Sequence, residues 1–220
     1  MKTKFLNYIL IIAITFLSLI SSGQETINDQ QKCKEILQLV SNSIQKNNAS
    51  KFSFKLEINS EDFNEVQNGY ALIKQDQFYY KTEEREVTSD GKNVWTYIFE
   101  DNECYIDLIT DLDNTINPSE IFTIWQSGFK FKYVSNKKLG NDLVHIINMY
   151  PENPKESKYH TLIMEVNESK KTINQASIKT KDGVTIKIYV NSLINNPEIK
   201  SDQFIWISNK SSDVDVIDNR

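Results

Sequence analysis

Two hydrophobic periods follow one another near the start of this chain, and each predicts a different element. Between Thr26 and Lys46 apolar residues recur every three or four positions, which places them on one stripe of an amphipathic helix. Residues 51–58 then alternate strictly between polar and apolar, as a strand with one buried face does. The sequence therefore predicts a helix followed by a half-buried strand. The helical stripe consists of Cys33, Ile36, Leu37, Val40 and Ile44.

The rest of the chain is dominated by short segments with strand-like patterns. Several are separated by pairs of turn residues such as Asp90-Gly91, and such short links force antiparallel pairing, because a parallel crossover needs about a dozen residues or more. We expect a mainly β fold whose sheet curls toward a barrel, in one domain over residues 24–220. The further strands are predicted at 66–74, 77–82, 85–89, 94–99, 103–109, 129–133, 143–150, 159–166, 172–180, 185–190 and 203–207.

The succession of strands breaks at residues 114–128, where the sequence predicts a second helix. Pro118 suits the first position of a helix, and Gly128 is a residue that commonly follows the last turn. The large apolar residues of this segment would share one helical face. They are Ile121, Phe122 and Trp125.

The first residues of the chain have the pattern of a secretory signal. Lys2 and Lys4 precede an apolar run over residues 5–20, and the small residues at 21–23 follow directly. A retained membrane anchor is the alternative, but a spanning helix needs roughly 20 predominantly apolar residues and this run is shorter. We therefore expect residues 1–23 to be a signal peptide and the remaining chain to be exported, in a soluble form, to the periplasm.

The charge balance is acidic, which argues against two classes of partner. The net charge is −5, and it becomes −7 after loss of the signal peptide, with 23 basic against 30 acidic residues. A nucleic-acid binder needs a basic footprint to displace counterions, and the lysines here are scattered among acids without forming a stripe. The same balance discourages contact with an anionic bilayer.

The sequence offers no constellation of residues for catalysis or for metal binding. His145 and His160 fall in different predicted strands, without ligands at zinc-binding spacing. Asp107, Asp111 and Asp113 lie close together, but the other positions of a calcium loop are absent, so a solvated acidic turn is the simpler interpretation. No phosphate-binding glycine loop or serine elbow is present. We expect no enzyme activity, no metal and no cofactor.

The two cysteines leave one question open. Cys33 falls in the predicted first helix and Cys104 in a predicted strand. An exported protein could join them in a disulfide, yet each also fits as an ordinary buried residue.

Large apolar side chains are concentrated on one face of the predicted sheet. The alternation predicts that Phe52, Phe54, Leu56, Ile186 and Ile188 point inward, whereas Lys55, Lys187 and Tyr189 point outward. Alternation reports burial but does not distinguish a packed core from a cavity. Both interpretations therefore remain open at this point. The whole apolar set comprises Phe52, Phe54, Leu56, Phe129, Phe131, Leu162, Met164, Val184, Ile186 and Ile188.

One stretch of the chain carries a specific family resemblance. Residues 89–97, Ser89-Asp90-Gly91-Lys92-Asn93-Val94-Trp95-Thr96-Tyr97, resemble the SDGK-x-x-W-x-Y stretch of the LolA family of lipoprotein carriers. A strand at 69–74 precedes it at the family's usual distance, and residues 117–122 resemble the version found in Bacteroidetes. The end of the chain, residues 213–220, is also similar to the family, so the resemblance covers nearly the whole expected mature chain.

The resemblance implies an incomplete antiparallel barrel of about eleven strands, with a helical lid over an apolar cavity that holds the acyl chains of outer-membrane lipoproteins. It further implies a monomeric carrier loaded by an inner-membrane lipoprotein-releasing ABC transporter and unloaded at an outer-membrane acceptor. The residues expected to bind lipid are Phe52, Phe54, Leu56, Leu72, Trp95, Tyr97, Ile121, Phe122, Trp125, Phe129, Phe131, Leu162, Met164, Val184, Ile186 and Ile188.

The sequence departs from the family at one position, and two alternative functions stay open. Lys74-Gln75-Asp76 stands where many members have Lys-Arg-Pro, so the arginine that latches the lid in those proteins is missing and their opening mechanism cannot be carried over. The alternatives are a carrier of another acyl lipid or a glycolipid, and a ligand-sensing domain of the envelope-stress type.

The N-terminal pattern leads to a testable prediction about export. Intact-mass analysis of the secreted protein should show the loss of residues 1–23, because the small residues at 21–23 suit a signal peptidase. A full-length product that stays in the membrane would contradict the prediction.

Overall fold

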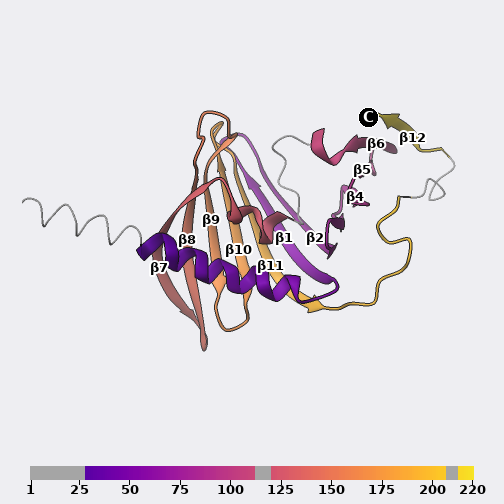
Figure 1. The fold of residues 1–220 in the computed structure, drawn as a ribbon. Coiled ribbons are helices and arrows are strands. Elements are labelled where there is room, and N and C mark those ends of the chain that lie inside the picture. Colours follow the sequence, from indigo (N-terminus) through magenta and orange to yellow (C-terminus); the bar gives the residue numbers. More distant parts are fainter. Residues whose placement is uncertain (1–27, 112–119, 207–212) are drawn as a thin grey trace, which may run out of the picture.

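The computed structural model describes residues 28–111, 120–206 and 213–220. They form an N-terminal helix over residues 28–45, a strongly curved sheet and three short 3₁₀ turns (Figure 1). The predicted signal peptide lies outside these residues. No helix of the described part is long and apolar enough to cross a membrane.

Twelve strands of the described residues form a single sheet. Its spatial order is β12-β6-β5-β4-β3-β2-β1-β11-β10-β9-β8-β7, so β7 and β12 are the two edges and the barrel is incomplete, as predicted. The strands are β1 (Ser50–Asn59), β2 (Asn64–Lys74), β3 (Gln77–Lys81), β4 (Arg85–Ser89), β5 (Asn93–Ile98), β6 (Glu103–Leu108), β7 (Phe129–Leu139), β8 (Asp142–Pro151), β9 (Tyr159–Asn167), β10 (Thr172–Thr180), β11 (Thr185–Asn195) and β12 (Asp215–Asp218).

Neighbouring strands pair antiparallel throughout the sheet except at one edge. β12 pairs with β6 in parallel, with Val216 opposite Cys104. A parallel partner is possible there because the chain travels around the whole sheet between β6 and β12, whereas strands joined by a tight turn can pair only antiparallel. β1 and β11, which no turn joins, also pair antiparallel. The antiparallel prediction is thus confirmed for the other strand pairs.

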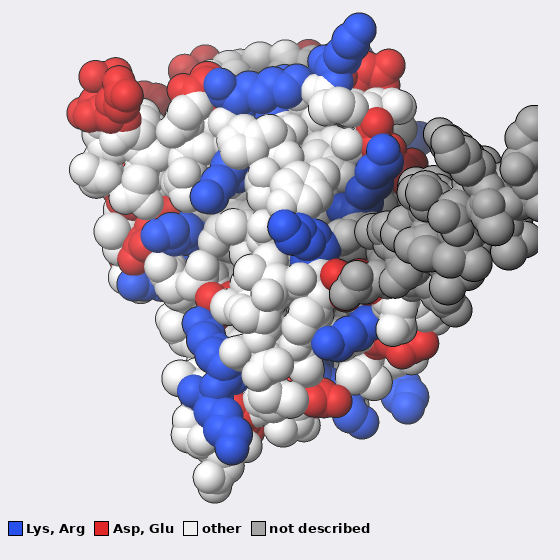
Figure 2. Space-filling model, turned by 90° about the vertical axis from the view of Figure 1, so that its left-hand side faces the viewer, with Lys and Arg blue, Asp and Glu red and all other residues white. Residues whose placement is uncertain are grey.

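The concave face of the sheet carries the main apolar core. In the pairing of β1 with β11, Leu56 lies opposite Ile188 and Ile58 opposite Ile186, so these side chains share that face. Phe52 and Phe54 are buried on the same face, while Lys55 and Tyr189 stand on the other. The predicted register is confirmed. Lysines such as Lys51, Lys55 and Lys187 stand on the convex face, and basic side chains lie scattered among uncharged ones in Figure 2.

Polar contacts fix the N-terminal helix to the rest of the molecule. The hydroxyl of Ser41, which is fully buried, donates to the carbonyl of Phe122 at 2.6 Å and accepts from Trp125 Nε1 at 2.9 Å. Near the other end of the helix, the Gln30 amide exchanges two hydrogen bonds with the backbone of Phe131 on the edge strand β7. These bonds satisfy buried polar groups and set how the helix lies over the core.

The predicted second helix is wrong as an α-helix. The described part of this segment holds two 3₁₀ turns, Glu120–Phe122 and Ile124–Gln126, while Pro118 lies outside the described residues. Thr123 between them has φ −128°, which interrupts the helical backbone. Gly128 ends the segment with φ +79°, as expected for a glycine after a helical turn. Ile121, Phe122 and Trp125 are nevertheless all buried in the core.

The predicted strand at 203–207 is also wrong within the described residues. Positions 201–205 form turns, and Ile207 lies outside the described residues. Phe204 is buried against Leu72 and Tyr79 on the convex side of β2 and β3. The alternation of Phe204 and Trp206 therefore reflects two burial contacts of an irregular segment, because no neighbouring strand pairs with it.

Gly69 generates a prediction about packing. A Cβ atom at this position would lie 2.5 Å from the carbonyl oxygen of Lys81 and 2.6 Å from Cζ of Phe54. Because a backbone atom is one of the obstacles, we expect Gly69→Ala to lower the free energy of unfolding by about 1–3 kcal/mol. Thermal melting would measure the loss, with Asn68→Ala at the exposed neighbouring position as the control. A Gly69→Ala protein that melts like the wild type would contradict this account.

The cysteines generate a second prediction. Both are free and buried, Cys33 in the N-terminal helix and Cys104 in β6. Burial, with a smaller effect of Asp29, raises the pKa of Cys33 to about 11, and burial with Glu86 raises that of Cys104 to about 12. The thiolate is the reactive form, so we expect neither to react with Ellman's reagent in the native protein and both to react in denaturant without reductant. Thiols that appear only after reduction would reveal a disulfide instead.

Candidate functional site

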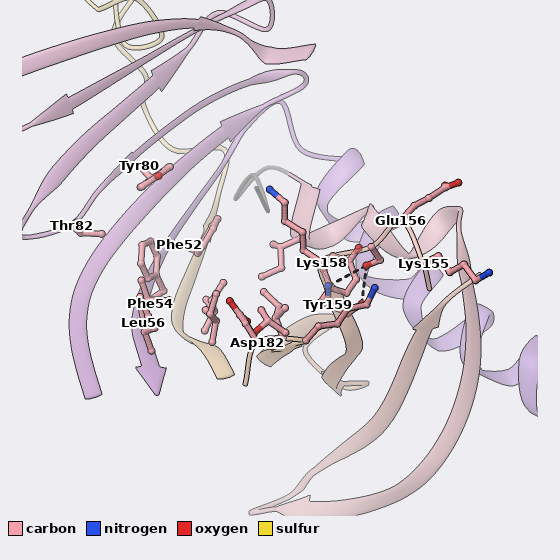
Figure 3. Close-up of a pocket in the computed structure, with 18 residues that line it drawn as sticks. Phe52, Phe54, Leu56, Tyr80, Thr82, Lys155, Glu156, Lys158, Tyr159 and Asp182 are labelled. Atoms are coloured by element: carbon pink, nitrogen blue, oxygen red, sulfur yellow. Dashed lines mark hydrogen bonds between the residues drawn. The ribbon is translucent and has the colours of Figure 1, made fainter. Parts of the chain in front are cut away.

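A cavity of about 730 Å³ lies on the concave side of the sheet. Its size is within the range of about 300–1,000 Å³ that is usual for ligand pockets. Figure 3 shows Phe52, Phe54 and Leu56 on one side, facing residues of the loop between β8 and β9. The lining residues are Phe52, Phe54, Leu56, Ile58, Tyr80, Thr82, Ile121, Lys155, Glu156, Ser157, Lys158, Tyr159, Ile178, Thr180, Lys181, Asp182, Ile186 and Ile188.

The apolar wall comes from three adjacent strands whose alternation points the same way. β1 contributes its inward residues, β11 contributes Ile186 and Ile188, and β10 contributes Ile178, which lies opposite Ile186. Leu56, Ile186 and Ile188 are only partly buried, although they face the core. Apolar side chains that face inward without being fully covered mark the place where the concave face is not filled by other parts of the chain.

The opposite side of the cavity is polar and is held by backbone hydrogen bonds. The amide of Lys181 donates to the carbonyl of Lys158 at 3.0 Å, which ties the β10–β11 turn to the β8–β9 loop. A hydrogen bond from the Thr180 hydroxyl lowers the pKa of Asp182 below its usual value, so this carboxyl is ionised at neutral pH. Lys155, Lys158, Lys181 and Asp182 are exposed and form the mouth of the cavity.

Two aromatic contacts hold rings that line the cavity against residues of the packed core. Phe52 meets Phe122 edge-on, with ring centroids 5.5 Å apart, and Phe129 stacks on Tyr159 with centroids 6.2 Å apart. Burial also raises the pKa of Tyr80, so its ring lines the wall as the neutral phenol. Rings of this kind are stiff, and they can border an open space without collapsing into it.

The structure brings together twelve of the sixteen residues that the sequence predicts as lipid-binding. Six of them line the cavity, namely Phe52, Phe54, Leu56, Ile121, Ile186 and Ile188. The other six belong to the same core but are packed away from the cavity: Phe122, Trp125, Phe129, Phe131, Leu162 and Met164.

The remaining four predicted residues lie elsewhere. Leu72 is on the opposite face of the sheet, in the cluster with Tyr79 and Phe204. Val184 lies in the β10–β11 turn, where its carbonyl accepts hydrogen bonds from Thr180. Trp95 and Tyr97 are on β5, several strands from the cavity, and Tyr97 packs on Phe99 and Trp206.

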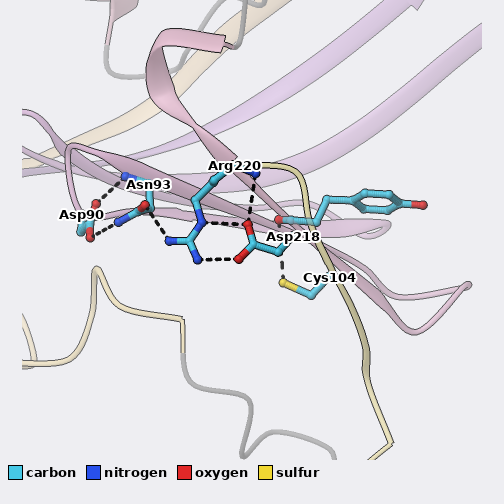
Figure 4. Close-up of polar contacts among 6 residues, drawn as sticks. Asp90, Asn93, Cys104, Asp218 and Arg220 are labelled. Carbon is cyan, nitrogen blue, oxygen red and sulfur yellow. Dashed lines mark hydrogen bonds and ion pairs between the residues drawn. The ribbon is translucent and has the colours of Figure 1, made fainter.

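The motif behind the family resemblance is a structural turn, shown in Figure 4. Asp90 accepts hydrogen bonds from the backbone amides of Lys92 at 2.8 Å and Asn93 at 2.7 Å. Burial acts to raise the pKa of Asp90, but the bonds from Asn93 and Lys92 outweigh it and leave the pKa below its usual value. Gly91 adopts φ +94°, a conformation that favours glycine.

The same turn anchors the end of the chain. Arg220 donates to Asn93 Oδ1 at 2.9 Å and forms a two-pronged contact with the carboxylate of Asp218, at 2.9 and 2.7 Å. The guanidinium lowers the pKa of Asp218 to about 2. These contacts hold β12 beside β6, so the motif positions the sheet edge and does not contact the cavity.

Sequence reasoning missed the whole polar mouth of the cavity. In the sequence, the β8–β9 loop has the composition of an ordinary solvated connection, since it follows Pro151 and contains Pro154 and several charged residues. Thr82 and Tyr80 follow strand periodicity, but their proximity to β10 depends on the curvature of the sheet. Only the inward alternation of β1 and β11 is a signal that the sequence displays directly.

A second cavity, of about 460 Å³, lies on the other side of the first 3₁₀ turn of this region. Phe122 and Thr123 border it, whereas Ile121 borders the large one. The turn Glu120–Phe122 therefore separates two spaces. The Ser50 hydroxyl in its lining is buried and has no hydrogen-bond partner among the described residues.

The candidate metal ligands are not gathered at either cavity. His145 hydrogen-bonds to Tyr133 at 2.9 Å and to Glu168 at 3.2 Å. None of these three residues lines the large cavity or the second one. Across residues 28–111, 120–206 and 213–220, no three His, Cys, Asp or Glu side chains are placed so as to hold a metal ion.

Comparison with known proteins gives likenesses of structure. No family model and no curated protein matches the sequence. An uncharacterised conserved protein from Thermus thermophilus is similar with a TM-score of 0.58 and 10% identity, over 85% of this chain and 99% of that one. A LolA superfamily protein from Nitrosomonas europaea has a TM-score of 0.43 and 9% identity, over 79% and 97%. The lipoprotein LppX from Mycobacterium tuberculosis has a TM-score of 0.42 and 10% identity, over 76% of this chain and 98% of that one. The likeness to the Thermus protein shows a shared fold.

Proposed function

We propose that this protein is a carrier that binds the acyl chains of lipoproteins in the large cavity and ferries them from the inner to the outer membrane. The observation that carries the proposal is the cavity of about 730 Å³, whose wall on β1, β10 and β11 is apolar and whose mouth is polar. This division matches an amphiphile, because its chains gain from leaving water while its polar end stays solvated.

The magnitude of the hydrophobic effect explains why a carrier would be needed. Moving an acyl chain of about fourteen methylenes from an apolar environment into water costs on the order of 11 kcal/mol of free energy, at about 0.8 kcal/mol for each methylene. Partly covered residues such as Leu56 and Ile188 offer an apolar surface in place of a membrane. The sequence resemblance to the LolA family supports lipoproteins as the cargo, with an ABC transporter as donor and an outer-membrane acceptor.

Filling the cavity should separate binding from stability. Ile188 lines the cavity and is only partly buried, whereas Leu162 is 2% exposed in the packed part of the same core. We expect Ile188→Trp to weaken the binding of a fluorescent fatty-acyl probe at least about tenfold, because the indole occupies space the chain needs, at little cost in stability. Leu162→Trp should instead destabilise the fold by about 1–3 kcal/mol through overpacking.

Both variants would be measured by probe titration and thermal melting on the same samples. Wild-type protein that does not bind the probe would remove the basis of the carrier proposal. Equal destabilisation by the two substitutions would show that the space around Ile188 is as tightly packed as that around Leu162.

A further inference from the structure

The convex face of the sheet has a charge opposite in sign to that of the chain. We call the outward side chains of β7, β8, β9, β10, β11 and β1 the basic face. It holds seven lysines and three acids, although the whole chain has a net charge of −5. The lysines are Lys51, Lys55, Lys130, Lys132, Lys137, Lys179 and Lys187, and the acids are Glu57, Asp142 and Glu165.

Strand register, and not sequence proximity, gathers these lysines. Lys130 and Lys132 alternate with the inward residues of β7, and Lys187 lies between the inward Ile186 and Ile188 of β11. One cross-strand row runs from Lys132 through Asn148, Ile163 and Ser177 to Lys187 and Glu57. Because neighbouring strands are about 4.8 Å apart, the two lysines of this row are roughly 19 Å from each other.

Each acid of the basic face is already paired with a lysine, Asp142 with Lys170 of the β9–β10 connection at 2.9 Å. Lys55 pairs with Glu57 and Lys137 with Glu165, each at 2.7 Å. Lys187 lies opposite Glu57, the partner of Lys55, whereas Lys51, Lys130, Lys132 and Lys179 form no ion pair among the described residues. Lys130, Lys132 and Lys179 are exposed. Figure 2, which faces the left-hand side of Figure 1, shows basic side chains distributed over this side of the molecule.

Between the lysines lie residues suited to the surface of a bilayer. Tyr150 is the cross-strand neighbour of Lys130, and Tyr189 is that of Lys55. Tyrosine has an apolar ring with a polar tip, and lysine has an apolar stem with a charged end, so both can lie along a headgroup layer. A broad convex surface meets laterally mobile lipid headgroups at many points, whereas it would touch the fixed phosphates of a nucleic-acid duplex along one line.

We propose that the basic face docks this protein on an anionic membrane surface. Lys179 and Lys187 lie at the end of the sheet next to the β10–β11 turn, and Lys130 lies opposite Tyr150, one residue from the start of the β8–β9 loop. Contact through these lysines brings the mouth of the large cavity beside the headgroups. The docking does not depend on what the cavity binds.

Vesicle sedimentation tests the proposal, with a control variant that loses the same number of charges at other positions. The purified protein should sediment with equimolar phosphatidylglycerol and phosphatidylcholine vesicles at low salt, less at high salt, and little with phosphatidylcholine alone, since screening weakens attraction between separated charges. The variant K130Q/K132Q/K179Q/K187Q should bind the anionic vesicles at least about tenfold more weakly, because each lysine near such a surface contributes about fivefold.

The control variant K46Q/K92Q/K138Q/K200Q removes the same charge from exposed positions outside the basic face. It should bind like the wild type, and thermal melting should show that both variants are folded. Equal loss of binding in the two variants would mean that net charge alone matters and would overturn the proposal. Binding of the wild type to duplex DNA but not to anionic vesicles would overturn it as well.

Discussion

The structure depends on a mismatch between the apolar area of the sheet and the area available to cover it. The strands from β7 to β2 all contribute apolar side chains to one concave face, and these must be kept from water. One helix over residues 28–45 and two 3₁₀ turns cover only part of this face. The buried contacts among Ser41, Phe122 and Trp125 hold the cover in one place, and the uncovered part becomes the large cavity.

The mismatch also gives the cavity its two-sided chemistry. Its wall is made by strand residues, which are apolar because alternation directs them inward, and its mouth by connections, which are polar because they meet water. Such a site has no need of a reactive group to act on a ligand. It offers a favourable surface to an acyl chain without enclosing it, which is the property that the proposed carrier requires in order to bind and still release.

Charge is distributed by the same alternation. The charged residues that alternate with the apolar ones of β7, β10 and β11 are lysines, whereas acids outnumber bases in the chain as a whole. The acidic balance of the sequence therefore argues against anionic partners, while the folded sheet presents a face on which seven lysines lie among three acids. Net charge is a poor guide here because it averages over surfaces that point in different directions.

The sequence by itself determined the segments that become β1 to β11, how neighbours pair across tight turns and which side chains of β1 and β11 face inward, because a period of two and a short link are local properties. It therefore located Phe52, Leu56, Ile186 and Ile188 correctly on one face. It did not determine β12, and the strand predicted at 203–207 is wrong. Only the tertiary structure decided that residues 120–126 form 3₁₀ turns and that Trp95 and Tyr97 lie away from the cavity. Curvature and coverage decide which inward residues stay unpacked, and they depend on contacts between distant segments that no local pattern records.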